Sequence, residues 1–242
     1  MVVWLHDALI AAHILVGTVG LVAFWVPVAG RKGGATHRAW GKVFWASMIA
    51  VGCLAVGIAA TTLLEPMATH VGFGLPEPVV VGIFGWMMLY LAVLTVTLAV
   101  YGRECIRNRR DHARHRRPSM LALHALLLVL SANCAWQGWR IGQPLMLGIS
   151  TIGFATVATD LRFMLAARPG PDAWLREHLK GLVGAGISVY TAFLAFGAVR
   201  LMPELALSPV LWAIPLVTGL GIIFWHWWDI WRKRQARRVA AA

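Results

Sequence analysis

Histidine is the residue type in this chain with the widest chemical capacity, because an imidazole can ligate a metal ion or haem iron and can exchange a proton near neutral pH. The chain holds nine histidines. Two of them, His124 and His226, lie inside long apolar stretches, about 7.5 Å and about 9 Å from the polar ends of those stretches if they are helical. Asp160 lies in a third apolar stretch, near the basic segment that follows it. Ionisable groups inside a membrane span are costly and usually functional, so we predict a polar site made by His124, His226 and Asp160.

Further polar side chains are predicted at the mouth of this site. His37 and His178 each precede an apolar stretch, and a basic rim would attract an anionic group such as a haem propionate or an acidic metabolite. The predicted rim consists of Arg162, Arg176 and Lys180. The candidate cofactor-binding residues are His124, His226, His178, His37, Asp160 and Arg162, with His124 and His226 as candidate ligands of haem b or of a metal ion.

Three functions fit these residues. A cofactor-binding or quinone-linked redox protein is our first prediction, because paired imidazoles hold b-type haem or a metal and arginines neutralise propionates or a quinone oxygen. A proton-coupled transporter of a small molecule is an alternative, with His124, Asp160 and Glu65 as titrating groups. A non-catalytic accessory subunit of a membrane complex is the third.

The sequence lacks the motifs of several common enzyme classes. It contains no His-Glu-x-x-His, no Gly-x-Ser-x-Gly and no phosphate-binding glycine loop. Neither Cys-x-x-Cys nor Cys-x-x-Cys-His occurs, which argues against structural zinc and c-type haem. No lysine lies within a predicted span, so a retinal Schiff base is not expected.

The elements that must position the site are membrane-spanning helices. The chain is 59% apolar and 13% charged, with a mean hydropathy of +0.70, which is far more apolar than a soluble domain. Continuous apolar runs of about 20 residues predict transmembrane helices and exclude barrel strands. We expect a single all-α transmembrane domain over residues 1–242 with seven spans: Ala8–Ala29, Val43–Leu64, Val79–Tyr101, Met120–Trp139, Pro144–Leu165, Gly181–Met202 and Pro209–Trp231.

The segment 101–117 determines the predicted orientation. It carries seven arginines against two acids, and so basic a loop stays in the cytoplasm. With this segment inside, residues 30–42, residues 162–180 and the tail from Arg232 also lie inside, and all but two of the 22 lysines and arginines become cytoplasmic. We therefore predict the amino terminus outside and the carboxyl terminus inside. The basic loops are expected to contact anionic lipids of the bilayer, not nucleic acid.

The two remaining cations, Arg140 and Arg200, are predicted at the outer boundary. An unpaired guanidinium in hydrocarbon costs about 2.5–3.5 kcal/mol. We therefore expect one of them to pair with Glu65, Glu204 or a lipid phosphate.

The spans can be grouped into three helical hairpins plus one helix. Spans one and two, three and four, and five and six are each joined by a basic loop with a histidine near the start of the next helix, at His37, His115 and His178. Short basic loops could also produce this pattern by chance, so a duplication is left open. Glycines within the spans favour close helix packing and allow a membrane-protein partner or a homo-oligomer.

A family resemblance rests on three of these positions. His13 in the first span, His37-Arg38-Ala39-Trp40-Gly41 opening the second, and His178 ahead of a span ending in Arg200 resemble an uncharacterised bacterial polytopic membrane-protein family, a domain of unknown function. Leu179-Lys180 after His178 departs from that family's pattern. The resemblance implies a multi-helix protein of the bacterial cytoplasmic membrane, and it implies no activity.

Reporter fusions test the predicted topology. A reporter placed after Arg117 and another placed after Ala242 should both report the cytoplasm, because both positions follow strongly basic segments. An external signal from either fusion would show that the number of spans is not seven.

Overall fold

The fold is a bundle of long helices. The structure, a computed structural model, describes residues 1–72, 74–197 and 209–239, and these ranges contain no β-strand. Seven helices within them are long and apolar enough to cross a membrane. The prediction of an all-α bundle of seven transmembrane helices is therefore confirmed, and the chain is a multi-pass membrane protein.

The bounds of the elements are as follows. The first two spans are α1 (Val2–Ala29) and α2 (Ala35–Leu64), and α3 (Pro66–Thr69) is a short helix after them. The third span consists of α4 (Glu77–Val80), the π-helix η1 (Val81–Met87) and α5 (Met88–Arg107), and the 3-10 helix η2 (His112–Arg116) follows. The remaining helices are α6 (Pro118–Arg140), α7 (Pro144–Met164), α8 (Ala173–Ala192) with the π-helix η3 (Phe193–Gly197), and α9 (Pro209–Val239).

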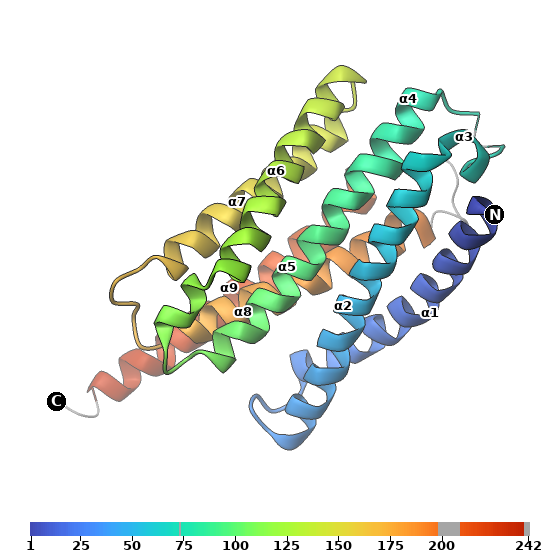
Figure 1. The fold of residues 1–242 in the computed structure, drawn as a ribbon. Coiled ribbons are helices and arrows are strands. Elements are labelled where there is room, and N and C mark those ends of the chain that lie inside the picture. The colour runs from blue at the N-terminus through green and yellow to red at the C-terminus, as the bar shows by residue number, and fades with distance from the viewer. Residues whose placement is uncertain (73, 198–208, 240–242) are drawn as a thin grey trace.

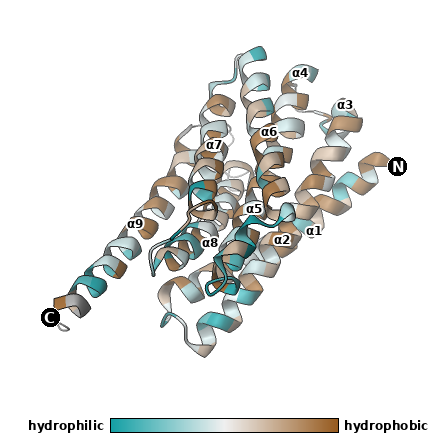
Figure 2. Cartoon of the chain, turned by 60° about the vertical axis from the view of Figure 1, so that its left-hand side comes forward, coloured by the Kyte–Doolittle hydropathy of each residue, from teal (hydrophilic) through white to brown (hydrophobic). Residues whose placement is uncertain are grey.

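Helix α5 occupies the centre of the bundle. It packs against α2, α6 and α8, while α7 packs on α6 and α9 packs on α8 (Figure 1). Its Tyr90 is fully buried in the main apolar core, together with Met87 before it. Figure 2 shows hydrophilic residues gathered toward the lower end of the bundle, in the last turns of α9 and in the loops, while the helices between are largely hydrophobic.

The helix pairing differs in part from the three predicted hairpins. Helices α1 and α2 form a closely packed pair, and α5 also contacts α6. Helix α7 packs chiefly on α6 and hardly touches α8, because α8 packs against α5 instead. The third predicted pair is therefore not a packed hairpin.

Several helices begin earlier than the hydropathy pattern predicts. The differences are largest in the second span, which begins at Ala35 and not at Val43, and in the sixth span, which begins at Ala173 and not at Gly181. The first two turns of α8 contain three charged residues, and two of them, Glu177 and Lys180, form ion pairs inside the bundle. Lys180 consequently lies within the span, contrary to the prediction that no span contains a lysine.

At the outer boundary the predicted arginine pairing is not observed for Arg140. This side chain is exposed and forms no ion pair with any residue that the structure describes. Arg200 and Glu204 lie outside the described residues, and pairing with a lipid phosphate stays a prediction.

The contact between α5 and α8 depends on two glycines. A Cβ atom added to Gly181 would lie 2.7 Å from the Gly102 Cα and 2.8 Å from the Leu98 carbonyl oxygen. Both atoms belong to the α5 backbone, so no side-chain rotation could relieve the overlap. Small residues allow such close approach of two helices in a membrane. The two glycines thus determine how near α8 lies to the centre of the bundle.

Substitution of Gly181 with alanine should destabilise the protein by about 1–3 kcal/mol, because the added methyl group must push α8 away from α5. Gly148→Ala on α7 is the matched control, since nothing lies within 4 Å of a Cβ atom at that position. Thermal unfolding in detergent, followed by circular dichroism, measures both changes. Equal melting temperatures for the two variants would show that the glycine contact carries no stability.

Candidate functional site

The centre of the candidate site is a buried hydrogen bond between two helices. His124 on α6 and Asp160 on α7 are 1% and 0% exposed, and the His124 Nε2 atom lies 3.1 Å from the Asp160 Oδ2 atom. The His124 Nδ1 atom lies 2.8 Å from the backbone oxygen of Met120. A carbonyl oxygen can only accept, so Nδ1 carries a hydrogen and donates it.

This geometry leaves one proton to be shared between His124 and Asp160. Either the imidazole is doubly protonated and Nε2 donates to a carboxylate, or a protonated carboxyl group donates to the Nε2 lone pair. The two forms differ only in the position of a proton across a 3.1 Å contact. The pair is thus able to hold or release a proton inside the membrane-spanning bundle.

Lys180 on α8 connects this pair to a second acid. Its Nζ atom lies 2.8 Å from Asp160 Oδ1, donates a hydrogen bond of 3.1 Å to Thr159 Oγ1, and forms a close ion pair with Glu177. The ammonium group therefore lies among three oxygens, with a hydrogen bond to Thr159 and ion pairs to Asp160 and Glu177. The Tyr101 hydroxyl on α5 donates to Glu177 Oε2 at 2.7 Å. The network therefore joins α5, α6, α7 and α8.

Charge balance decides which protonation state suits this environment. The network contains two acids, one lysine and one histidine. With both acids and Lys180 ionised, the charges sum to zero only when the imidazole of His124 is protonated on both nitrogens and is positively charged. A buried charge without a partner is strongly unfavourable, so loss of that proton leaves a negative charge that something else must compensate.

Local structure explains how the side chains meet. Pro118 begins α6, where the absence of an N–H group is tolerated, and His124 follows within two turns. Glu177 and Lys180 are three residues apart on α8 and share one face of that helix. The rings of Tyr101 and His124 meet edge to face with centroids 5.8 Å apart, which closes the apolar side of the network.

Two of the predicted mouth residues make hydrogen bonds between helices. His178 Nδ1 on α8 donates to the backbone oxygen of Gly102 on α5 at 2.8 Å. His37 Nδ1 on α2 donates to the backbone oxygen of Pro27 on α1 at 3.2 Å. Both histidines therefore tie neighbouring helices together, and neither is hydrogen-bonded to His124 or Asp160.

The predicted pairing of His124 with His226 is not what the structure shows. His226 is half-buried on α9, where it interacts electrostatically with Lys32, Asp229 and Lys233. Helix α9 packs on α8, whereas α6 packs on α5 and α7. The shared His124–His226 site was inferred from matching depth along two helices, and depth does not determine which helices are neighbours.

The metal-ligand role predicted for His124 also conflicts with its contacts. Both of its ring nitrogens are engaged, one by Met120 and one by Asp160. Across residues 1–72, 74–197 and 209–239, no three His, Cys, Asp or Glu side chains converge as metal ligands would. Arg162, predicted to contribute to the rim, is exposed and forms no ion pair within those ranges.

Glu177 and Tyr101 were not predicted as site residues, and Lys180 was predicted on the rim of the site. Lys180 in fact points inward, to Asp160 and Glu177. The available signal was the spacing of Glu177 and Lys180, which places an acid and a base on one helix face. That signal was lost because the sixth span was predicted to begin after both residues.

Comparison of the chain with family models, with curated protein sequences and with solved structures gave no match. The resemblance to an uncharacterised bacterial family therefore stays a prediction. Fold and site together define the class to which the chain belongs: a multi-pass membrane protein with a His–Asp–Lys–Glu–Tyr network, in which His124, Asp160 and Tyr101 are buried and Lys180 and Glu177 are half-buried.

Replacement of Asp160 with asparagine should destabilise the protein by about 3–5 kcal/mol, because it leaves Lys180 and His124 without their shared carboxylate. The double variant Asp160→Asn, Lys180→Met should lose less stability than the two single variants added together. Chemical unfolding in mixed micelles measures all three.

The matched control is Asp229→Asn, which breaks ion pairs with the exposed side chains of Arg232 and Lys233 on α9. Surface pairs contribute little, so its stability should equal that of the unsubstituted protein. Additive losses in the double variant would contradict the coupling of Asp160 with Lys180.

Proposed function

We propose that the protein is a proton-coupled transporter of a small molecule in which the His124–Asp160 pair binds and releases the coupled proton. One observation carries this proposal. The Met120 oxygen holds His124 Nδ1 as a donor, so the proton between Nε2 and Asp160 is the one that can leave or arrive. Ionisable pairs of this kind inside a span are characteristic of proton relays in pumps and transporters.

The groups next to the His124–Asp160 pair make the charge of the network depend on whether this proton is present. Lys180 holds Asp160 through its second oxygen, so the carboxylate cannot turn away when its proton partner changes. Deprotonation leaves the network with one excess negative charge in a medium of low dielectric constant. A cationic solute that enters, or a helix movement that admits water, would relieve this charge. The coupling of proton release to solute movement follows from that requirement.

Irregular helix geometry supports movement of the surrounding spans. The third and sixth spans contain π-helical segments at Val81–Met87 and Phe193–Gly197, and Pro215 lies inside α9. Such segments weaken the regular hydrogen-bond ladder and are frequent at functional sites. Transporters use interrupted helices of this kind to alternate between open states.

The other predicted functions have weaker support. A haem-, metal- or quinone-linked redox role was predicted from His124 and His226 as a pair of ligands. Both ring nitrogens of His124 are hydrogen-bonded within the protein, so neither is free to bind iron or another metal. An accessory-subunit role needs no buried ionisable pair, and the contact between His124 and Asp160 is such a pair. Residence in a bacterial inner membrane and association with anionic lipids, a membrane-protein partner or a second copy stay predictions.

Direct observation of the proton tests the proposal. In nanodiscs containing protein with ¹⁵N-labelled histidine, the His124 nitrogen signals should shift between pH 5 and pH 9, and a carboxyl infrared band lost in Asp160→Asn should change with them. His13→Gln is the matched control, because His13 Nδ1 donates to the backbone oxygen of Val51. Removing it should leave both signals intact.

Flux measurements test the coupling. Liposomes containing the protein and an internal pH-sensitive dye should acidify or alkalinise when a panel of cationic, neutral and anionic solutes is added. Asp160→Asn should abolish the response to the active solute, whereas Asp229→Asn should retain it. Constant protonation of both groups across the pH range would contradict the proposal and leave the network as a structural link between helices.

A further inference from the structure

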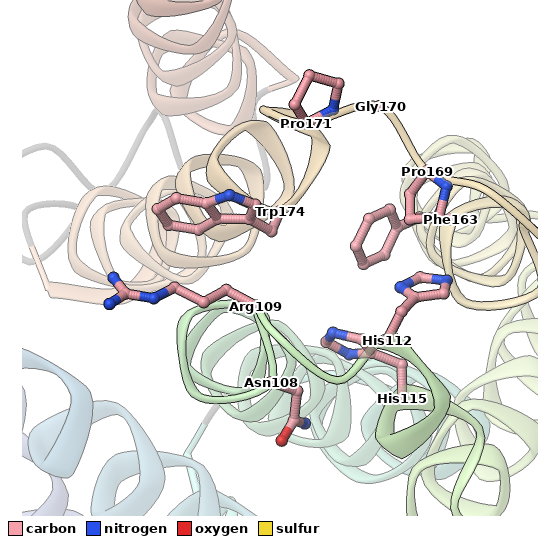
Figure 3. Close-up of a pocket in the computed structure, with 9 residues that line it drawn as sticks. All are labelled: Asn108, Arg109, His112, His115, Phe163, Pro169, Gly170, Pro171 and Trp174. Atoms are coloured by element: carbon pink, nitrogen blue, oxygen red, sulfur yellow. The ribbon is translucent and has the colours of Figure 1, made fainter.

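A second polar site lies in a small cavity at the end of the bundle that carries the basic loops. The cavity has a volume of about 120 Å³ and lies between the α5–α6 loop and the α7–α8 loop (Figure 3). Asn108, Arg109, His112 and His115 form one side, and Phe163 and Trp174 are among the residues on the other. None of the residues in the His124 network lines it.

Two imidazoles on the cavity wall have unsatisfied nitrogen atoms. His115 is 1% exposed, and its Nδ1 atom has no hydrogen-bond partner among the described residues. The Nε2 atom of His112 is also buried and unpaired in that part of the chain. The two rings lie 5.3 Å apart. A buried polar atom without a partner is unfavourable, so two of them on one cavity wall point to a ligand inside it.

The charge around the cavity determines the sign of that ligand. The segment 101–117 contains seven arginines and two acids, and both acids are already paired. The ion pairs are Glu104 with Arg107 and Arg117, and Asp111 with Arg114. Arg109 lines the cavity and forms no ion pair with a described residue, so the site has an excess of positive charge. Such a site favours an anion.

We propose that this cavity binds a phosphate-type oxyanion, held by His112 Nε2, His115 Nδ1 and the guanidinium of Arg109. The volume is suited to one tetrahedral oxyanion and is too small for a whole nucleotide. The oxyanion would accept hydrogen bonds from the imidazoles and a charge-assisted bond from the arginine. Its source is either the headgroup of an anionic lipid or a soluble phosphate, since the basic loops lie where lipid headgroups begin.

Arg109 must move when the anion binds. Figure 3 shows its side chain extended beside Trp174, with the guanidinium turned away from the two imidazoles. The guanidinium carbon lies 5.8 Å from the centre of the indole ring, and the side chain is exposed. Rotation of this exposed side chain toward the cavity would exchange a weak cation–π contact for a stronger bond to the anion.

Proton uptake should accompany binding. Burial, followed by the neighbouring His112, lowers the pKa of His115 from 6.5 to about 4; Arg117 also lowers it, while Glu104 and Asp111 act in the opposite direction. His115 is therefore neutral at pH 7 when no anion is bound. An anion stabilises the imidazolium form and raises this pKa, so affinity for the anion should increase as the pH falls from 7 toward 5.

The test uses sulfate and inorganic phosphate as probes, with the full-length protein in zwitterionic nanodiscs. Sulfate keeps one charge across the working range, so calorimetric titration at pH 5.5 and at pH 7.5 isolates the proton uptake of the protein. We expect tighter binding at pH 5.5. His112→Asn and Arg109→Ala should each weaken binding about tenfold, because each removes a bond to a charged ligand.

The matched control is Arg110→Ala, which removes an adjacent, exposed arginine that does not line the cavity. Its affinity should stay close to that of the unsubstituted protein. His115→Asn alters a buried residue and could unfold the loop, so the conclusion rests on the His112 and Arg109 variants, with their melting temperatures measured alongside. An equal loss of affinity in Arg110→Ala and Arg109→Ala would show that the anion is attracted by the charge of the whole loop and not by this site. Absence of both sulfate and phosphate binding to the unsubstituted protein would also overturn the proposal.

Nanodiscs containing phosphatidic acid distinguish the two sources. If the occupant is a lipid headgroup, phosphatidic acid should block sulfate binding to the unsubstituted protein, and ³¹P spectra should show retained lipid that is lost in His112→Asn. If the occupant is soluble phosphate, sulfate binding should be the same in both lipids. Either result supports the oxyanion site.

Discussion

The ion pair between Asp160 and Lys180 is the interaction on which the loop-proximal half of the bundle depends. Asp160 is fully buried, and a carboxylate in that position requires partners that a lipid environment cannot supply. Lys180 supplies the balancing charge on one oxygen and His124 supplies a hydrogen-bonding partner on the other. Because the three residues come from three helices, satisfying one carboxylate determines how α6, α7 and α8 are arranged.

The close approach of α5 and α8 makes this pairing possible. Gly102 and Gly181 let the two backbones meet, and the adjacent His178 donates to the Gly102 oxygen across the same contact. With α8 at that distance, Glu177 lies within reach of the Tyr101 hydroxyl, and Lys180 reaches Asp160. The close backbone packing and the hydrogen bonds and ion pairs between the helices thus support each other. In a membrane the hydrophobic effect does not drive helices together, so interactions of these two kinds specify how they are arranged.

The two proposed sites are separated by a few aromatic side chains. Phe163 contacts the ring of Tyr101, which borders the buried network, and the rings of His112 and His115, which line the oxyanion cavity. The acids of the network are paired with Lys180 and hydrogen-bonded to His124 and Tyr101, whereas the cavity has unsatisfied imidazole nitrogens and excess positive charge. These differences in hydrogen bonding are why we propose different chemistry for the two sites: proton exchange in the first and anion binding in the second.

The sequence alone determined the class of fold, because seven apolar runs of sufficient length leave helices as the structure able to satisfy the backbone in lipid. It also identified His124 and Asp160 as costly residues inside spans that require partners. The identity of the partners was decided by tertiary structure. Hydropathy places a residue at a depth but does not say which helices are neighbours, so His226 was predicted where Lys180, Glu177 and Tyr101 are found. The backbone contact at Gly102 and Gly181 brings α8 beside α5, and a long-range packing contact of this kind leaves no periodic signal in the sequence.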